Sequence, residues 1–398
     1  MIIVEVNSYN YGSTGTIMRS IASSARKKGN TVYLCYPKRR SSFLRYEKND
    51  IWIGNILLRN FWLFLSERLP LTRFAHYFET KRFVSKLKSL HPDVIHIHNL
   101  HSSYLNIPIF FNYLANSDAK IVWTLHDCWS FTGHCPHFEH IGCYKWEDGC
   151  YSCNLYKEYP YSSFDNSSYM YALKKKCFTK LDNLKIITPS RWLLNYVKRS
   201  FLKEFPIEVV NNGIDLSRFH PVKSKFREQN GIGERVLLLG VSMVWDNNKG
   251  LDVFVELGKR LPQDKFSIVL VGTDDAVDDL LPSNIISIHR THSVDELIEI
   301  YSAADAFINP TRIDTFPTVN IEALACGTPV ITYDTGGSPE IIDDKSGIVT
   351  ESKTVESTVK AICKIGRKTR YIEECCIRRS QQFSLEKMAE KYIAIFQE

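Results

Sequence analysis

Residues 305–340 read DAFINPTRIDTFPTVNIEALACGTPVITYDTGGSPE, and no other part of the chain says more about how it folds. Residues 306–308 form a short apolar run, as expected of a buried strand. Pro317 suits the first turn of a helix, and Gly327 predicts where that helix ends. A second apolar run follows at 329–333. This succession of strand, helix and strand indicates a parallel sheet covered by helices.

Two acidic residues lie eight positions apart within this stretch. Asp314 precedes the predicted helix, and Glu322 lies one turn inside it. The free amides of Thr318 and Val319 at the helix start can hold an anion. A carboxylate one turn further can accept hydrogen bonds from both hydroxyls of a ribose. Together these features point to a site for a nucleotide diphosphate.

Short apolar runs of the same kind recur along both halves of the chain, separated by helical patterns. They lie at 2–6, 31–36, 93–98, 120–126, 185–190, 236–242, 266–272 and 305–310. This alternation predicts an α/β protein with two doubly wound, Rossmann-like domains. An Asn-Asn-Gly turn and a closing Pro221 mark the boundary between them. We therefore expect domains at 1–210 and 222–383, a linker at 211–221 and a final helix at 384–398.

Length and composition agree with this organisation. A chain of 398 residues suits two or three domains, and 44% hydrophobic with 24% charged residues is ordinary for a globular protein. The net charge of +6 is too small to indicate nucleic-acid binding. The first residues lack the basic start of a signal peptide, and no run of 18 apolar residues predicts a membrane-spanning helix.

The acidic pair, with TFP between its members and ALACGTPV and DTGGSPE after it, resembles the donor-sugar motif of retaining GT-B glycosyltransferases, in particular family 4. The run NGIDLSRFHP at 212–221 resembles the interdomain linker of that family. The family usually carries Glu at both acidic positions, whereas here the first is Asp314, one methylene shorter. The resemblance implies a GT-B fold, with two Rossmann-like domains facing a central cleft. It also implies that the last helix crosses back to the first domain.

The turn after the first strand contains Gly12 and Gly15, with a helix expected from about Thr16. Glycines allow the backbone to approach a ligand, and a helix start favours anions. The pattern is not G-x-G-x-x-G, so it does not support dinucleotide binding. One interpretation is a tight strand-to-helix turn. The resemblance implies a second interpretation, in which this turn forms the floor of the catalytic cleft and contacts the donor.

Histidines follow two of the predicted strands. His126 ends the strand at 120–126, where ligands bind in open α/β sheets. Family 4 has a similar His close to the transferred sugar, which implies that His126 orients the sugar or the leaving phosphate. Asp127 either positions His126 or caps the following turn. His96, His98 and His101 either line the acceptor side or simply pack.

Further donor-binding residues follow from the resemblance. Lys249 matches the second member of a basic pair that grips the diphosphate, whereas the first, usually Arg, falls near Met243. The segment with Arg290 and Thr291 matches backbone that holds the base, and Arg290 either reaches the diphosphate or lies at the surface. Asp314 would lie near the sugar hydroxyls or the reacting carbon. No D-x-D occurs, which predicts a metal-independent transfer with no catalytic cofactor.

A cysteine-rich insertion at 128–153 predicts a separate, structural metal site. Its C-x(2)-C end and spacing favour a zinc ion held by Cys135, Cys143, Cys150 and Cys153. Free thiols or disulfides are the alternatives. His134, His137 and His140 are substitute ligands. A subset of polysaccharide glycosyltransferases has a similar WSFTGHC insertion.

Residues 51–90 mix apolar and aromatic side chains with basic ones, among them Arg59, Arg68 and Arg73. This pattern fits amphipathic helices that lie on a membrane surface or receive a lipid-linked acceptor. The alternative is an ordinary helix pair that buries its aromatic residues.

Taken together, these patterns and the resemblance predict a glycosyltransferase that moves a hexose from a UDP or GDP sugar to a lipid-linked saccharide, with retention of configuration. The expected pathway is a bacterial surface polysaccharide such as lipopolysaccharide O-antigen, capsule or exopolysaccharide. We expect a cytoplasmic protein that contacts the inner membrane peripherally. The alternatives are a non-catalytic nucleotide-sugar-binding partner and a GT-B sugar-nucleotide epimerase.

Overall fold

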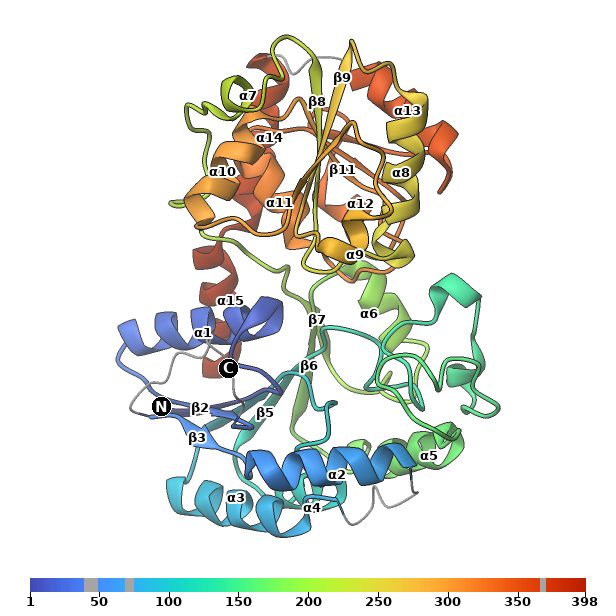
Figure 1. Ribbon diagram of the computed structural model, residues 1–398. Helices are drawn as coiled ribbons and strands as arrows, with labels where there is room; N and C mark the ends of the chain where they lie inside the picture. The colour runs from blue at the N-terminus through green and yellow to red at the C-terminus, as the bar shows by residue number, and fades with distance from the viewer. Residues whose placement is uncertain (39–48, 69–74, 366–369) are drawn as a thin grey trace. The chain divides into compact units, whose positions relative to one another are not determined.

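The chain folds into two compact units, each built on a parallel sheet (Figure 1). The computed structural model describes residues 1–38, 49–68, 75–365 and 370–398. Unit 1 comprises Met1–Val210 together with Met388–Glu398, and unit 2 comprises Asn211–Lys387. The predicted α/β class with two Rossmann-like sheets is confirmed.

The sheet of unit 1 has seven strands in the order β3-β2-β1-β4-β5-β6-β7, all parallel. The strands are β1 (Ile2–Val6), β2 (Thr31–Tyr36), β3 (Ile51–Trp52), β4 (Val94–Ile97), β5 (Lys120–Thr124), β6 (Leu184–Thr188) and β7 (Ile207–Val209). The chain moves in one direction from β1 to β3 and in the other from β4 to β7. In open α/β sheets, ligands bind outside the carboxyl ends of the strands at such a reversal.

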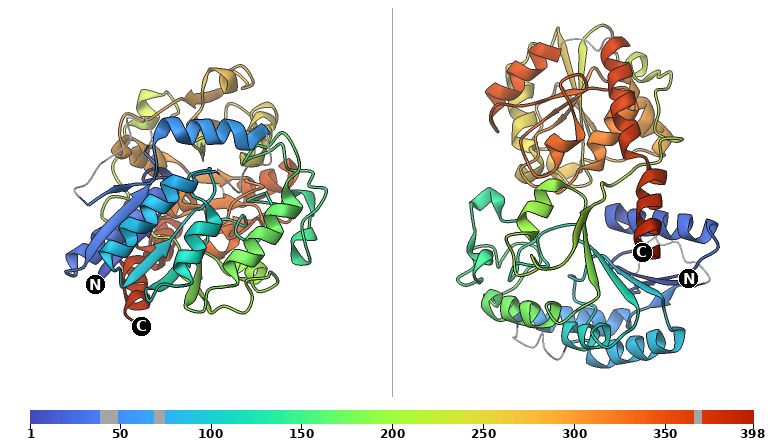
Figure 2. Two further views of the ribbon diagram at one scale, coloured as in Figure 1. Left: turned by 90° about the horizontal axis from the view of Figure 1, so that it is seen from below. Right: turned by 180° about the vertical axis from the view of Figure 1, so that it is seen from behind.

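Helices cover both faces of this sheet, with α1 on one face and α3 and α4 on the other (Figures 1 and 2). They are α1 (Gly12–Lys27), α2 (Ile56–Arg68), α3 (Tyr77–Leu90), α4 (Ile107–Leu114), α5 (Ser167–Phe178) and α6 (Arg191–Val197). The cysteine-rich insertion between β5 and α5 contains only the short 3-10 turns η1 (Glu139–Ile141) and η2 (Lys145–Glu147).

The expected start of the first helix is wrong by one turn. Helix α1 begins at Gly12 rather than near Thr16, so both glycines lie in its first turn. Gly12 has φ +70°, a conformation that other residues rarely adopt. A Cβ on Gly15 would lie 2.5 Å from the carbonyl carbon of Asn10. The helix therefore starts early because its glycines let the preceding turn fold tightly onto it.

The last helix, α15 (Leu385–Gln397), completes unit 1, as the resemblance implied. Its apolar side chains are buried, namely Met388, Ala389, Tyr392, Ile393, Ile395 and Phe396. The rings of Tyr392 and Phe396 lie 5.1 and 5.3 Å from the ring of His96 in β4. Lys120 of β5 donates a hydrogen bond to the carbonyl of Ile395. Residues far apart in sequence thus share one core.

The sheet of unit 2 has six strands in the order β10-β9-β8-β11-β12-β13, all parallel. They are β8 (Val236–Val241), β9 (Phe266–Val271), β10 (Ile285–Ile288), β11 (Ala306–Asn309), β12 (Val330–Thr332) and β13 (Gly347–Val349). The strand order reverses between β8 and β11. The loops that follow these two strands are therefore the expected ligand-binding loops of unit 2.

Helices α8 and α13 cover one face of this sheet, and α10, α11 and α14 cover the other (Figure 1). The helices are α7 (Phe226–Gln229), α8 (Leu251–Arg260), α9 (Asp275–Asp278), α10 (Val294–Ala303), α11 (Thr318–Ala325), α12 (Ser338–Ile341), α13 (Val355–Ile365) and α14 (Arg370–Ser380), with 3-10 turns η3 (Asn247–Lys249) and η4 (Gln381–Phe383). The predicted succession β11, α11 and β12 is confirmed. Helix α11 begins directly after Pro317, and Gly327 follows its end with φ +76°.

Every helix in the described ranges is either too short or too polar to pass through the hydrocarbon core of a bilayer.

Candidate functional site

The two loops at the strand reversal of unit 2 dock onto each other. The backbone amide of Arg312, in the loop after β11, donates to the carbonyl of Asn248 at 2.7 Å. Gly250 has φ +80°, and a Cβ there would lie 2.5 Å from a side-chain carbon of Pro310. Glycine at position 250 is what allows the loop after β8 to approach the loop after β11 so closely.

This docking brings Lys249 and Asp314 together. The Lys249 ammonium donates to Oδ2 of Asp314 at 2.9 Å and to the carbonyl of Ile313 at 3.1 Å. The side chains are 36% and 23% exposed, so water and ligands reach both. Two residues that the sequence marked separately therefore form one charged pair at the carboxyl edge of the sheet. A phosphate arriving there would compete with the Asp314 carboxylate for the lysine.

The turn at Gly336 and Gly337 packs against the loop that carries Asp314. Gly336 has φ +56°, and a Cβ on it would lie 1.6 Å from the carbonyl oxygen of Asp314. The amide of Gly337 donates to the carbonyl of Thr315 at 3.0 Å. Any side chain at position 336 would displace Asp314, which explains why DTGGSPE and Asp314 belong to one motif.

Helix α11 carries Thr318, Val319 and Glu322, each partly exposed. Among the described residues no side chain caps the start of this helix, so its first amides point at the loop that precedes it. Tyr301 donates a hydrogen bond to Oε2 of Glu322 at 3.2 Å. Burial raises the pKa of Glu322 to about 7. The predicted anion site and the predicted ribose ligand thus lie one helical turn apart.

Arg290 and Thr291 follow the edge strand β10, which β9 separates from β8. Arg290 is exposed and Thr291 is partly exposed. The neighbouring His289 lies 2.6 Å from Oδ2 of Asp278, and this contact raises the pKa of His289. The position at a strand end is compatible with base binding, and the roles of Arg290 and Thr291 stay predictions.

Sequence reasoning missed Arg312. Its guanidinium binds both carboxylate oxygens of Asp252, in the first turn of α8, at 2.8 Å each. This bidentate pair lowers the pKa of Asp252 and ties the Asp314 loop to a helix. The available signal was a basic residue two positions before Asp314, but its partner is 60 residues away in the sequence.

In unit 1, His126 follows β5 and is partly exposed. Its Nε2 lies 2.9 Å from Nδ1 of His98, and the two rings stack at 5.2 Å with an angle of 9° between their planes. Burial lowers the pKa of His126 to about 4, so the ring is neutral near pH 7. His126 can therefore donate or accept hydrogen bonds as a neutral ring.

Asp127 caps the turn after β5, which is one of its two predicted roles. Its Oδ1 accepts from the amide of Trp129 at 2.8 Å, and its Oδ2 lies 3.0 Å from Nε2 of His101. Burial raises the pKa of Asp127, but the electrostatic interaction and hydrogen bond with His101 outweigh it and lower that pKa. The carboxylate is thus engaged by His101 and the turn, and the ring contact that the structure records for His126 is with His98.

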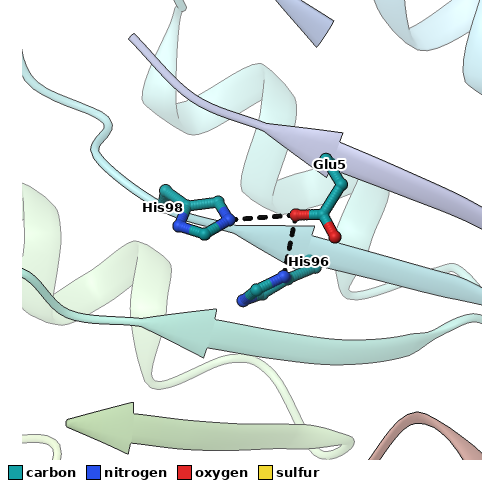
Figure 3. A group of neighbouring side chains, drawn as sticks. All are labelled: Glu5, His96 and His98. Atoms are coloured by element: carbon teal, nitrogen blue, oxygen red, sulfur yellow. Dashed lines mark hydrogen bonds and ion pairs between the residues drawn. The ribbon is translucent and has the colours of Figure 1, made fainter. Parts of the chain in front are cut away.

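Sequence reasoning also missed Glu5, which lies inside β1. Its Oε2 is 2.8 Å from Nδ1 of His96 and 2.9 Å from Nε2 of His98, as Figure 3 shows. All three side chains are fully buried. Burial raises the pKa of Glu5 and lowers the pKa of both histidines to about 3. Of the two roles left open for His96 and His98, packing within the core is what the structure shows.

The spacing of this cluster is too short for metal ligation, and its contact between His98 and Glu5 is a hydrogen bond. The three donor atoms lie within 4.8 Å of one another. Two ligands that are each about 2.0–2.1 Å from a tetrahedral zinc ion lie about 3.3 Å apart. The oxygen of Glu5 is closer than that to both rings, at normal hydrogen-bond distance.

Cys135, Cys143, Cys150 and Cys153 line one cavity together with His134. All four are free thiols, and Cys150 accepts from the amide of Gly133 at 3.0 Å. Burial raises the pKa of Cys135 to about 12 and that of Cys150 to about 11. Within the described ranges, no set of three ligand atoms within 4.8 Å of one another includes a cysteine. The thiols share a cavity, and zinc binding stays a prediction.

Helices α2 and α3 carry an exposed apolar surface. Its side chains are Leu57, Leu58, Phe61, Phe64 and Phe78, of which Phe78 is 80% exposed. An ordinary helix pair would bury these aromatic residues, so this surface is unlike the interior of a domain. Arg73, one of the basic residues noted in this segment, lies outside the described residues.

Comparison with known proteins agrees with the geometry. The sequence profile of Glycosyltransferase Family 4 matches residues 14–218, and that of Glycosyl transferases group 1 matches residues 234–367. The chain is 25% identical over 346 residues to WcaC of Escherichia coli K12, whose name assigns it to colanic acid biosynthesis as a glycosyl transferase; the match covers 81% of this chain and 80% of WcaC.

Solved structures share the whole fold. Sucrose-phosphate synthase from Thermosynechococcus elongatus superposes with a TM-score of 0.73 at 17% identity, covering 100% of this chain and 98% of that one. Anabaena Alr3699/HepE, solved in complex with UDP and glucose, gives a TM-score of 0.68 at 15% identity and covers 99% of both chains. At 15–17% identity, this similarity supports the fold alone.

Proposed function

Because the chain belongs to glycosyltransferase family 4, we propose that it transfers a sugar from a UDP or GDP sugar to a saccharide acceptor with retention of configuration. The observation that carries this proposal is the carboxyl edge of unit 2. There Lys249, the open start of α11 and Glu322 supply a cation, free amides and a carboxylate in the order that a diphosphate and a ribose require.

Each donor-binding residue has a separate task. Glu322 accepts the ribose hydroxyls, and the amides of Thr318 and Val319 bind the diphosphate. When the bond between the anomeric carbon and the phosphate oxygen breaks, negative charge grows on the leaving diphosphate. In this proposal Lys249 stabilises that charge without a metal ion, and Arg290 with Thr291 holds the base.

The remaining residues act on the sugar. Asp314 binds sugar hydroxyls near the reacting carbon, and its shorter reach alters which sugar fits. His126 of unit 1 orients the sugar or the leaving phosphate, while Asp127 holds the turn that carries it. Gly12 and Gly15 let the first turn of α1 approach the donor. Replacing Asp314 with Ala without losing transfer would remove the role assigned to it.

The exposed surface of α2 and α3 suits a lipid-linked acceptor at the cytoplasmic face of the inner membrane. Exposed leucines and phenylalanines can enter the headgroup region, and neighbouring basic residues such as Lys81 and Arg82 attract anionic lipid. The name of WcaC favours a surface polysaccharide as the product. Flotation with vesicles of anionic or zwitterionic lipid tests the membrane contact; no binding to either would exclude it.

The four cysteines that share a cavity are proposed to bind a structural zinc ion. Four ligands would close the coordination sphere, so the ion would stabilise the insertion without taking part in transfer. Metal analysis of unchelated protein should find about one equivalent of zinc. A content below a tenth of an equivalent would contradict this proposal.

The function is tested first by thermal unfolding with UDP, GDP, ADP, CMP and dTDP. A ligand at about 100 times its dissociation constant stabilises by about 2.7 kcal/mol, which raises the melting temperature by a few degrees. We expect one nucleotide to do so, and Glu322→Ala to abolish the shift. Glu299→Ala, on an exposed face of α10 in the same unit, is the matched control and should keep it.

Transfer is then measured as release of nucleoside diphosphate with and without a saccharide acceptor. Release that requires the acceptor, with the sugar found on it, supports a glycosyltransferase. Nucleotide binding without any release would identify a non-catalytic binding partner. Isomerised nucleotide sugar without an acceptor would identify an epimerase.

A further inference from the structure

A buried chain of polar groups connects α15 to His126 through the core of unit 1, with hydrogen bonds at every step except the contact between His96 and Glu5. The hydroxyl of Tyr392 lies 2.9 Å from Oγ1 of Thr124, which lies 2.8 Å from Nε2 of His96. Nδ1 of His96 and Nε2 of His98 meet at the same oxygen of Glu5 (Figure 3). Nδ1 of His98 then reaches Nε2 of His126 at 2.9 Å. Each group in this series therefore contacts the next one.

We propose that this chain runs in a single direction and fixes His126 as the Nδ1–H tautomer, so that His126 presents an N–H donor at the carboxyl edge of unit 1. Tyr392 donates to Thr124, and Thr124 donates to Nε2 of His96, whose Nδ1 lies 2.8 Å from Oε2 of Glu5 without a hydrogen bond among the described residues. The carboxyl proton of Glu5 is donated to Nε2 of His98. His98 must then donate from Nδ1 to Nε2 of His126.

The direction follows from the cost of burying charge. Glu5, His96 and His98 are fully buried, and a carboxylate with neutral histidines would leave a net negative charge inside the sheet. Adding one proton to the hydrogen bond between Glu5 and His98 makes the cluster neutral, and His96 does not share that proton because its Nδ1 has no hydrogen-bond partner among the described residues. Whether Glu5 or His98 carries the added proton, a proton remains on Nδ1 of His98, because its Nε2 faces Glu5. The result for His126 is therefore the same in both cases.

Nearby groups agree with a proton on Glu5. Burial raises its pKa, whereas burial lowers the pKa of His98 to about 3. The charge of Arg26 is a smaller influence that lowers the pKa of Glu5. Oε1 of Glu5 has no partner among the described residues, as expected if Oε2 carries the proton and makes the contacts.

This inference rests on the proposed role of His126 and makes it narrower. A ring with Nδ1–H can donate to a sugar oxygen or to an oxygen of the leaving phosphate, but cannot take a proton at that atom. Nδ1 of His126 makes no hydrogen bond to the described part of the chain, so this atom is available to a ligand. Glu5 and His98 are positioning residues, because they act on the ligand only through His126.

The tautomer is measured by ¹⁵N NMR of the full chain labelled in its histidine rings. The His126 signals are assigned by their loss in His126→Gln. We expect Nδ1–H for His126 in the wild-type protein near pH 7.5. Glu5→Gln keeps a donor group opposite His98 and should keep this tautomer, whereas Glu5→Met has no donor and should give a mixture of both tautomers.

Activity provides a second readout. The kcat of Glu5→Met should fall below that of Glu5→Gln by on the order of tenfold, with the KM for the nucleotide sugar unchanged, because only the orientation of His126 differs. His96→Gln is the matched control for disturbing the cluster. It removes the other ring at Oε2 but leaves the contact between His98 and His126, so the His126 tautomer should persist.

Two results overturn the inference, and a third removes only the proposed role of His126. Nε2–H on His126 in the wild-type protein would mean that Glu5 is an ionised carboxylate and the chain runs the other way. Nδ1–H together with one equivalent of tightly bound transition metal that Glu5→Gln removes would mean a metal centre. Should the tautomer be as expected while His126→Ala transfers sugar at the wild-type rate, the proposed role of His126 fails and the hydrogen-bond direction stands.

Discussion

The two units keep their ionisable groups in opposite surroundings. In unit 1, the side chains of Glu5, His96 and His98 are fully buried, and Glu5 contacts both histidines. In unit 2, Lys249 and Asp314 lie on loops at the edge of the sheet, within reach of water. Buried groups act through the direction of hydrogen bonds, whereas accessible groups act through charge. Substitutions should therefore disturb stability in unit 1 and ligand handling in unit 2.

The largest loss of stability is expected for Phe396→Ala in α15. Phe396 is buried against unit 1, and removing a buried phenylalanine costs about 3–5 kcal/mol. Calorimetry should show a lower transition for unit 1, while the nucleotide still stabilises unit 2. The neighbouring exposed Gln397→Ala should leave both transitions in place. A loss of nucleotide binding in Phe396→Ala would contradict the separation of the two units.

Lys249→Ala should give the largest loss of catalysis. Without the ammonium, the charge on the leaving diphosphate is unsupported, and kcat should fall about 10²–10³-fold, or about 3–4 kcal/mol in the activation free energy. The melting temperature of the protein should change little because the pair with Asp314 is partly exposed. Lys259→Ala, on the surface of α8, is the control. Equal kcat in the two variants would exclude Lys249 from the reaction.

Glu322 predicts a pH effect of up to about 3 kcal/mol on the stability of unit 2. Its pKa rises from 4.5 to about 7 on folding, so the folded state binds the proton more tightly. This contribution is complete below pH 4.5 and is lost as the pH rises through 7. Urea unfolding of the wild-type protein minus that of Glu322→Gln should show this decline. A difference that stays constant from pH 5 to 8 would mean that Glu322 does not titrate in this range.

Tyr392→Phe should have the smallest effect. It removes the hydroxyl that bonds Thr124 but keeps the ring against His96, so unit 1 should lose about 1 kcal/mol. The comparison with Phe396→Ala separates a hydrogen bond from packing in one helix. A loss as large as that of Phe396→Ala would mean that the whole buried chain depends on Tyr392.

The two regions also differ in how far the sequence predicts them. The charged pair of unit 2 lies in loops that follow apolar runs and precede a Gly-Gly turn, so each member is marked locally. Glu5 stands alone in an apolar strand, and its partners are His96 in β4 and His98 directly after it, a pattern that is visible only when the pairing of β1 with β4 is known. Arg312 was missed for the same reason, since Asp252 is its partner across two loops.

Most strands were predicted from short apolar runs, such as 306–308 and 329–333. Strands β3, β7 and β13 were missed because two or three residues at or near a sheet edge carry too little pattern. The first helix was predicted to start late because Gly12 and Gly15 resemble loop residues, whereas the tight turn at Asn10 needs them inside the helix. Local sequence therefore defined the elements, and contacts between distant segments defined their ends.

The place of α15 has a consequence for how the protein is made. The core of unit 1 includes Tyr392, Ile393, Ile395 and Phe396, which leave the ribosome after all of unit 2 has been synthesised. The core of unit 1 therefore stays incomplete until the ribosome has added residues 211–387 and then α15. A nascent chain arrested before position 388 would expose the apolar face that α15 covers, and this is the stage at which a chaperone would find a binding surface.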